Sequence, residues 1–269
     1  MKKWNGSWQI VLILLAVISL GGCKMEKSTE SKELNLQTDG VALLDIQSGP
    51  GDLVIAGDEH ATSITAKAEI VRQGLGKGQG YTFKLDKDGD IAKLTADTKG
   101  GLIILQNTRI NVTVTVPVGL ALRVKDGSGD LHIENVAGGL EVKDGSGNIE
   151  LRDVQAISAI HDDSGNIILD GTSGNIDLRD GSGDLTVSTH TGNLTIKDDS
   201  GDIRLQGVHG NISVNDGSGG LAVNSVKGNV WVSDGSGDIA IDEVEGNVTI
   251  ANDGSGQLAI HNVTGTVTK

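Results

Sequence analysis

The stretch DGSGDLHIENVAGGLEVK (126–143) decides the fold, because altered copies of it fill the rest of the chain. Each copy opens with Asp, then Gly or Asp, then Ser-Gly. Successive copies start 18 residues apart, except that the last starts one residue late. A period of this length, sustained over eight copies, indicates a solenoid and not a string of separate domains. The opening residues are Asp126, Asp144, Asp162, Asp180, Asp198, Asp216, Asp234 and Asp253.

Apolar residues occupy fixed places in each copy, separated by gaps of 2, 3, 4 and 2 residues. Residues two apart lie on the same side of a strand, so each copy predicts two short strands. These gaps do not fit the six-residue spacing of a triangular helix. They favour an all-β, parallel solenoid with two flattened sheets, in which Ile203 and Leu205 are buried and Arg204 and Gln206 exposed. In the first copy the apolar places are Leu131, Ile133, Val136, Leu140 and Val142.

Glycines head the two halves of most copies, as Gly129 and Gly138 do in the first. Glycine adopts positive φ without a Cβ clash, so these places predict tight turns. Ala156 replaces the second glycine of the next copy. The corner of that coil is therefore expected to differ from the others.

The chain begins MKKWNGSWQIVLILLAVISLGGC, in which two lysines precede an apolar run of 13 residues. The run suits a signal peptide and is shorter than the roughly 20 residues that span a bilayer. The following LGGC resembles a bacterial lipobox, which implies that Cys23 is acylated and begins the mature chain. We therefore expect a signal peptide over 1–22, a lipidated, flexible tether over 23–40, an irregular β region over 41–125 and solenoid repeats over 126–269.

The net charge of the chain is −14, and removal of the signal takes away two lysines and no acid. So acidic a chain is not expected to bind nucleic acid or anionic lipid headgroups non-specifically. Membrane attachment would then come from the lipid on Cys23. Lys24 stands where Asp favours inner-membrane retention in proteins that the leader resembles. We therefore expect the cell envelope as the location, at the outer membrane more than the inner.

Two further segments, SGPGDLVIAG (48–57) and INVTVTVPVGL (110–120), precede the succession of SG[DN][IL] units. With these units they resemble the bacterial β-strand-repeat family known as putative adhesins, whose function is unknown. The resemblance covers nearly all of residues 41–269. It implies a β-solenoid architecture and brings no catalytic residues.

The repeated Asp turns raise the question of calcium. Calcium-binding β-rolls use nonapeptides of the form GGxGxDxUx, and the half-repeat here is also nine residues. The Asp stands one position early, however, and an apolar residue follows it. Asp and Ser can instead bond the N–H groups of their own turn. No cofactor is therefore expected, and the calcium candidates left open are Asp126, Asp144, Asp180, Asp216 and Asp234.

No residue is predicted to be catalytic. The GSGD strings are turns, and their serines lack a His and acid partner. The six histidines are scattered, and His190 replaces an apolar corner residue. An enzyme is therefore not expected.

Trp231 lies between inward Val230 and Val232, so its ring should point outward. An exposed Trp often marks a contact surface. The sequence thus predicts a structural or interaction module that binds a protein or glycan on an outer sheet face. Alternatives are a calcium-stabilised repeat module and an envelope-stress accessory protein. The last strand edge, at Val267-Thr268-Lys269, has no capping helix in sequence, which predicts either end-to-end association or shielding of the edge by Lys269 and a partner.

Overall fold

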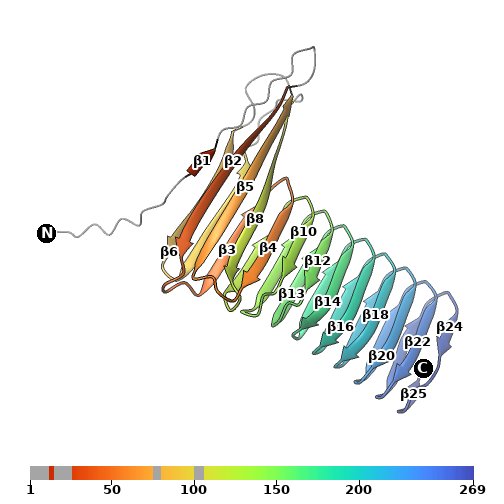
Figure 1. The fold of residues 1–269 in the computed structure, drawn as a ribbon. Coiled ribbons are helices and arrows are strands. Elements are labelled where there is room, and N and C mark those ends of the chain that lie inside the picture. Colours follow the sequence, from red (N-terminus) through yellow and green to blue (C-terminus); the bar gives the residue numbers. More distant parts are fainter. Residues whose placement is uncertain (1–11, 15–25, 75–79, 100–105) are drawn as a thin grey trace.

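The computed structural model describes residues 12–14, 26–74, 80–99 and 106–269, and every regular element in these residues is a β-strand. Two long sheets stack coil upon coil into an elongated solenoid (Figure 1). None of the described residues forms a helix able to cross a membrane.

Sheet A has 13 strands and sheet B has 12. Sheet A contains, in spatial order, β1 (Leu12–Leu14), β2 (Glu26–Gln37), β5 (Ser63–Gly74), β8 (Gln106–Pro117), β4 (Leu53–Asp58), β10 (Leu131–Glu134), β12 (Ile149–Arg152), β14 (Ile167–Ser173), β16 (Leu185–Thr191), β18 (Ile203–His209), β20 (Leu221–Val226), β22 (Ile239–Val244) and β24 (Leu258–Ile260). Sheet B contains β25 (Val267–Thr268), β23 (Val248–Asp253), β21 (Val230–Asp234), β19 (Ile212–Asp216), β17 (Leu194–Asp198), β15 (Ile176–Asp180), β13 (Ile157–Asp162), β11 (Leu140–Asp144), β9 (Ala121–Lys125), β3 (Leu43–Ser48), β7 (Ile91–Thr98) and β6 (Tyr81–Asp88).

Each 18-residue coil gives one strand to each sheet, and equivalent residues pair in parallel register. Ile203 of β18 lies beside Leu221 of β20, and Ile212 of β19 beside Val230 of β21. The fold predicted from the repeat, a parallel β-solenoid with two sheets, is confirmed.

The core between the sheets is aliphatic, as the scarcity of aromatic residues in the repeats requires. Ile203 and Leu205 are buried, whereas Arg204 and Gln206 between and beyond them are exposed. The alternation confirms the predicted inward and outward positions. Because each coil supplies only a few aliphatic side chains, stability depends on stacking against neighbouring coils.

One corner of each coil carries a residue in the left-handed conformation, and most of these residues are not glycine. Ala156 adds a further one, with φ of 55°. A register irregularity beside Leu140 accompanies it, so the corner of this coil differs as predicted. The repeated corner residues are Asn135, Asp153, Gly171, Thr189, Gly207, Ser225, Glu243 and Asn262.

The glycines of the tight turns are required by close backbone approach as well as by φ. A Cβ added to Gly201 would lie 1.7 Å from the carbonyl oxygen of Gly183 in the coil below. Only glycine permits these turns to stack at the spacing of the strands.

Residues 26–37, predicted as part of a flexible tether, form strand β2, and this part of the prediction is wrong. All twelve residues of β2 pair antiparallel with β5. Leu34 and Leu36 alternate with polar residues and are buried against the core, which explains why the strand is held. Because most of residues 26–37 are polar, their composition alone did not indicate that they form a half-buried strand.

Strands β2, β5 and β8 extend beyond the coils as an antiparallel projection that we call the blade (Figure 1). Glu26 and Gln106 each pair with Gly74 at its tip. Both sheets continue without a break across residue 126, and one hydrophobic cluster fills the described chain. Residues 41–125 are therefore the irregular first coils of the same solenoid, with no separate core.

Candidate functional site

Seven of the eight Asp residues that open the repeats form a buried column along sheet B, whereas the last, Asp253, is exposed. Asp198 lies beside Asp180 on one side and Asp216 on the other, at equivalent ladder positions. Seven carboxyls share this environment, each no more than 4% exposed. They are Asp126, Asp144, Asp162, Asp180, Asp198, Asp216 and Asp234, and we call them the Asp column.

One oxygen of most column carboxyls is used by the turn that follows. Oδ1 of Asp198 accepts the N–H of Ser200 at 3.1 Å, and Oδ1 of Asp216 accepts that of Ser218 at 3.1 Å. Oδ2 of each has no hydrogen-bond partner. At the first coil, both oxygens of Asp126 and the nearby Oγ of Ser48 lack one. The prediction that these Asp side chains bond N–H groups of their own turns is thus confirmed for one oxygen of most of the carboxylates.

Burial raises the pKa of all seven column carboxyls, and neighbouring carboxylates raise several further. The pKa reaches about 7 for Asp126 and Asp198, and about 6 for Asp144, Asp180 and Asp216. Burial also raises the pKa of Asp162 and Asp234. The column carboxyls therefore keep their protons to a higher pH than ordinary Asp side chains do, and a protonated carboxyl can donate as well as accept.

The calcium candidates all belong to this column. The described residues contain no group of three or more His, Cys, Asp or Glu side chains placed to hold a metal ion. Calcium takes six to eight oxygen ligands, whereas the column carboxyls lie in single file along the strand ladder. The calcium interpretation remains a proposal that metal removal can test.

A second column of side chains lies at the turn edge and was not anticipated from the sequence. Oδ1 of Asp130 accepts the N–H of Asn148 at 3.1 Å, and Oδ1 of Asn148 accepts that of Asn166 at 3.2 Å. Oδ1 of Asp52 accepts the N–H of Asp130 in the same way, so this column also links the irregular first coils to the repeats. The signal was the Asp or Asn that follows Ser-Gly in six of the eight copies.

His190 is buried and satisfied within the fold. Its Nδ1 lies 3.0 Å from Oγ1 of Thr172 and its Nε2 lies 3.0 Å from the carbonyl oxygen of Gly174. Burial lowers the pKa of His190 and favours the neutral ring. It is a structural corner residue, as its place in the repeat predicted.

Trp231 is 39% exposed on the outer side of sheet B, where its sequence position placed it. Its ladder neighbours are Ser213 and Thr249. Beside the ring is a hollow of about 270 Å³ with no charged side chain in its lining, and we call it the Trp231 hollow. It is lined by Asn193, Leu194, Thr195, Asn211, Ile212, Ser213, Asn229, Val230, Trp231 and Thr249.

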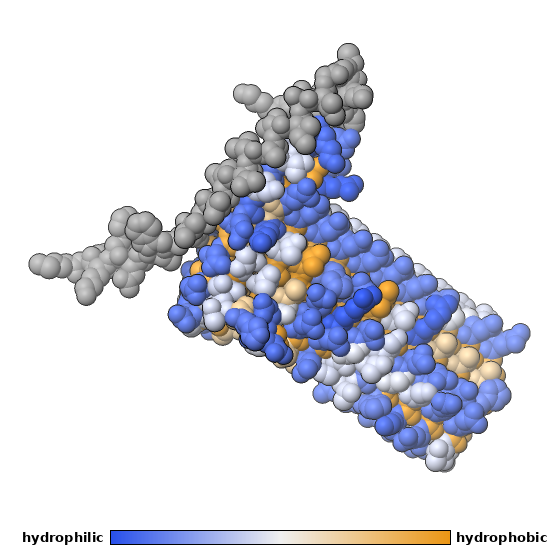
Figure 2. Space-filling view, viewed as in Figure 1, coloured by the Kyte–Doolittle hydropathy of each residue, from blue (hydrophilic) through white to orange (hydrophobic). Residues whose placement is uncertain are grey.

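The asparagines of the Trp231 hollow are held rigidly by one another. Oδ1 of Asn211 accepts both the N–H and the Nδ2–H of Asn229, at 2.9 and 3.2 Å. On the face of the coil stack visible in Figure 2, hydrophilic side chains dominate and hydrophobic ones occur in small separate spots. The hollow therefore combines an aromatic ring with ordered amides and hydroxyls.

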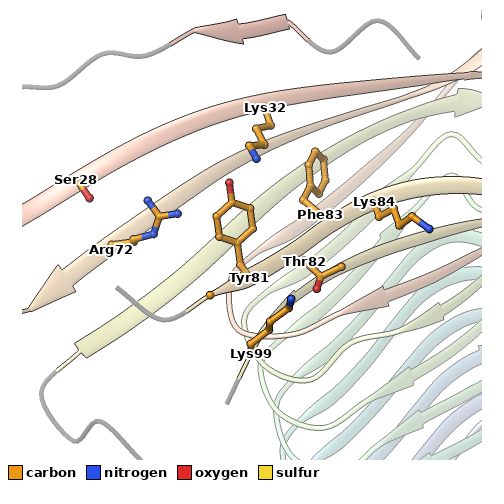
Figure 3. Close-up of a pocket in the computed structure, with 9 residues that line it drawn as sticks. Ser28, Lys32, Arg72, Tyr81, Thr82, Phe83, Lys84 and Lys99 are labelled. Carbon is orange, nitrogen blue, oxygen red and sulfur yellow. The ribbon is translucent and has the colours of Figure 1, made fainter. Parts of the chain in front are cut away.

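A different pocket, of about 740 Å³, lies where the blade meets strand β6 (Figure 3). Lys32 of β2 and Arg72 of β5 both point at the ring of Tyr81, with Nζ and Cζ at 4.9 and 5.0 Å from its centre. We call it the Tyr81 pocket. Its lining is Ser28, Lys32, Arg72, Gly80, Tyr81, Thr82, Phe83, Lys84 and Lys99.

Glu30 fixes the two cations that face Tyr81. Its carboxylate lies 3.1 Å from Nη2 of Arg72 and 3.5 Å from Nζ of Lys32. Although partial burial acts to raise it, hydrogen bonds with Tyr81 and Arg72 hold the pKa of Glu30 below its usual value. A hydrogen bond with Tyr81 likewise raises the pKa of Lys32, so both groups are charged at neutral pH.

Cys23, the predicted acylation site, lies outside the described residues, as does most of the predicted signal peptide over 1–22. The rest of the chain, an acidic and repetitive β-solenoid, can be assigned to a protein family. The chain belongs to the Toastrack DUF4097 family, whose profile matches residues 51–209.

Solved structures resemble the chain weakly. They include a putative adhesin from Parabacteroides merdae, with 16% identity over 93% of this chain and 98% of that one, and a TM-score of 0.39. Another is a putative cell adhesion protein from Clostridium sporogenes, with 14% identity over 91% and 100% and a TM-score of 0.33. A third is a putative lipid binding protein from Parabacteroides distasonis, with 12% identity over 90% and 96% and a TM-score of 0.39. No curated protein matches the chain. The family and these structures are not described as enzymes.

Proposed function

We propose that the protein is a non-enzymatic, membrane-anchored module of the cell envelope that holds an extended partner against the outer face of sheet B. A lipid on Cys23 would supply the anchor, and the outer membrane is the favoured location. The observation that carries the binding role is Trp231, an exposed aromatic ring beside an uncharged hollow on a chain of net charge −14.

The chemistry of the Trp231 hollow favours a neutral glycan over a peptide. An aromatic ring can stack on the apolar face of a sugar, while amides and hydroxyls exchange hydrogen bonds with its hydroxyl groups. Ser213, Thr249 and Thr195 present hydroxyls around the ring. A peptide strand would seek an unpaired backbone edge, whereas β19, β21 and β23 are each paired on both sides.

Binding is tested by affinity electrophoresis through gels that contain neutral cell-wall polysaccharide. Trp231→Ala should remove most of the retardation and leave the unfolding temperature unchanged, because the ring is outside the core. Ile168→Ala is the matched control, since Ile168 is 41% exposed but lies on the opposite sheet. Equal retardation of wild type and Trp231→Ala would remove Trp231 from the site.

Anchoring is tested separately by fractionation of cells. Cys23→Ser should prevent acylation and release the chain from the membrane pellet. A processed Cys23→Ser chain that still sediments with membranes would contradict the lipid anchor. The result is independent of Trp231, so the two parts of the proposal can fail separately.

A further inference from the structure

The Tyr81 pocket has a charge opposite to that of the chain. Its lining holds four cationic side chains and no Asp or Glu, in a sequence with 36 acidic and 22 basic residues. Two nearby carboxylates lie outside the lining: Glu30 bridges Lys32 and Arg72, and Asp86 pairs with Lys84 at 2.5 Å. The cations outnumber these carboxylates, and Lys99 forms no ion pair with a described residue.

Strands β2, β5 and β6 build most of the pocket, and two of its four cations, Lys32 and Arg72, are held in advance of any ligand. Tyr81 stands at the start of β6, the edge strand of sheet B, while Lys32 and Arg72 come from sheet A. Cation–π contact on the ring and the salt bridges to Glu30 restrict both side chains. In Figure 3, Lys99 approaches Tyr81 from the side opposite Lys32.

A phosphate group fits this set of donors. Arginine offers a planar pair of N–H groups to phosphate oxygens, and lysines add point charges. The volume of about 740 Å³ exceeds what a bare phosphate needs and leaves room for the glycerol that carries it.

The place of the pocket in the chain indicates where such a phosphate would come from. Ser28 lines the pocket and lies five residues after Cys23, a distance that an extended chain spans in at most about 18 Å. An acylated Cys23 would therefore hold the tip of the blade close to the lipid headgroups. The acidic coil stack would lie farther from the membrane, where salt screens its repulsion from an anionic surface.

We propose that the Tyr81 pocket binds the phosphate of an anionic phospholipid headgroup and so docks the blade on the membrane surface. The lipid source rests on the anchor proposed above, whereas phosphate recognition rests on the pocket alone. Docking would set the coil stack at a defined angle to the membrane and leave the Trp231 hollow free.

The test uses the mature chain, residues 23–269 with Cys23→Ser, so that neither an acyl chain nor the apolar leader contributes, and vesicles of phosphatidylcholine with or without phosphatidylglycerol. The wild-type pocket should bind the phosphatidylglycerol vesicles more tightly. Lys84→Gln and Lys99→Gln should each weaken that binding about five-fold, the effect of one cation near an anionic surface, without changing binding to phosphatidylcholine. The matched control is Lys197→Gln with Lys227→Gln on the coil stack, which should change binding little.

Equal losses in the pocket and control variants would show general charge attraction and overturn the pocket. Tyr81→Leu adds a second check, because it removes the ring that orders Lys32 and Arg72 while keeping every charge; unchanged vesicle binding would count against the proposal. Inorganic phosphate that competes as well as phosphatidylglycerol vesicles would assign the pocket to free phosphate and overturn the lipid source. None of these outcomes depends on acylation, which the fractionation of Cys23→Ser cells tests.

Discussion

Asp198 and Asp216 lie side by side in the ladder between β17 and β19, both buried and each with one carboxylate oxygen that has no hydrogen-bond partner. Two ionised carboxylates at the strand spacing of about 4.8 Å would repel by about 3 kcal/mol at an effective dielectric of 20. A proton on one carboxyl removes the repulsion and supplies a donor for the unpartnered oxygen of the other. The Asp column is therefore best described as a file of carboxyls that share protons.

The first prediction is that the protein is more stable in mild acid than at neutral pH. In the unfolded chain the column carboxyls have their ordinary pKa of about 3.9, and in the folded chain the pKa rises to about 7 for Asp198. Stability from a raised carboxyl pKa is fully present below the unfolded value and is lost as pH rises through the folded value. The unfolding temperature should therefore fall between about pH 4 and pH 7, as followed by circular dichroism.

Other acids near the column act in the same direction. Asp52, Asp163, Asp199 and Asp202 each raise the pKa of at least one column carboxyl. The trend is thus opposite to that of most proteins, whose paired carboxylates lose stability in acid. An unfolding temperature that rises steadily from pH 4 to pH 7 would contradict protonation of the column.

The second prediction is that Asp198→Asn stabilises the protein at pH 8 by about 1–3 kcal/mol, the range for satisfying a buried polar group. The amide has nearly the shape of the carboxyl, carries no charge and can donate to an unpartnered oxygen of Asp180 or Asp216. At pH 4 most of the gain should vanish, because Asp198 is then protonated in the folded chain and about half protonated in the unfolded chain, where its pKa is about 3.9. Denaturant unfolding at the two pH values measures the difference.

Asp170→Asn is the matched control for this substitution, since Asp170 is exposed on β14 of the opposite sheet. It should change stability by less than about 0.5 kcal/mol at either pH. A destabilised Asp198→Asn at pH 8, with Asp170→Asn unchanged, would show that the column needs its negative charge.

The third prediction concerns metal removal. The described residues hold no group of three or more His, Cys, Asp or Glu side chains placed for a metal ion, so a calcium chelator should leave the unfolding temperature at pH 7 unchanged. A calcium-stabilised module would melt earlier in chelator and recover with added calcium. Calorimetry with chelator, and again after calcium is restored, distinguishes the two.

Much of the solenoid could be predicted because its first seven copies keep a constant step of 18 residues. The 18-residue step fixed which residues stack, and alternation fixed that Ile203 points inward. The same alternation places Asp144 inward, two residues after buried Val142, so burial of the column was present in the sequence. Because Asp-Gly-Ser-Gly has the composition of a turn, its Asp was assigned to the turn, although it is also the last residue of the preceding strand.

The features that could not be predicted arise from contacts distant in sequence. The Tyr81 pocket needs β2, β5 and β6 to meet, and no repeat links these strands. The left-handed residue at one corner of each coil could not be predicted for another reason. Its residues include Asn135, Thr189 and Glu243, which share no side-chain chemistry, so only the backbone reveals the position.

The fourth prediction follows from that corner. Thr189 has φ of 57°, a conformation that is costly for a β-branched residue, whereas Gly207 holds the equivalent place with φ of 67°. Thr189→Gly should stabilise the protein by up to about 1 kcal/mol, the strain relieved less the added entropy of the unfolded chain. The reverse change, Gly207→Thr, should destabilise it by a similar amount. Urea unfolding measures the free energy of unfolding of both variants. A change of the same sign in both would contradict backbone strain at Thr189.

The last prediction is that two molecules associate through their C-terminal ends. Sheet A ends at β24 and sheet B at β25, and each end strand is paired on one side only. Val267 is 47% exposed there, although its equivalents Val248 and Val230 are buried. Such an edge offers both apolar surface and free backbone groups to a second strand.

The two ends of the solenoid differ, which limits the assembly to a dimer. The blade and the antiparallel pair β6 and β7 form the other end, so it does not repeat the coil surface. Contact between two C-terminal ends is symmetric and closes at two copies. Sedimentation velocity should therefore show a monomer that becomes a dimer, and no larger species, as concentration rises.

Val267→Pro tests the contact within this edge. In the parallel pair of β23 and β25, Val248 donates to the carbonyl oxygen of Thr266, so the N–H of Val267 points away from β23 to the free side. Proline removes that donor without breaking a bond inside the chain and should abolish the dimer at unchanged unfolding temperature. Val267→Thr keeps the donor and should still dimerise. A dimer that persists in Val267→Pro would show that association uses another surface, and a strict monomer of the wild-type chain at high concentration would show that the edge stays free.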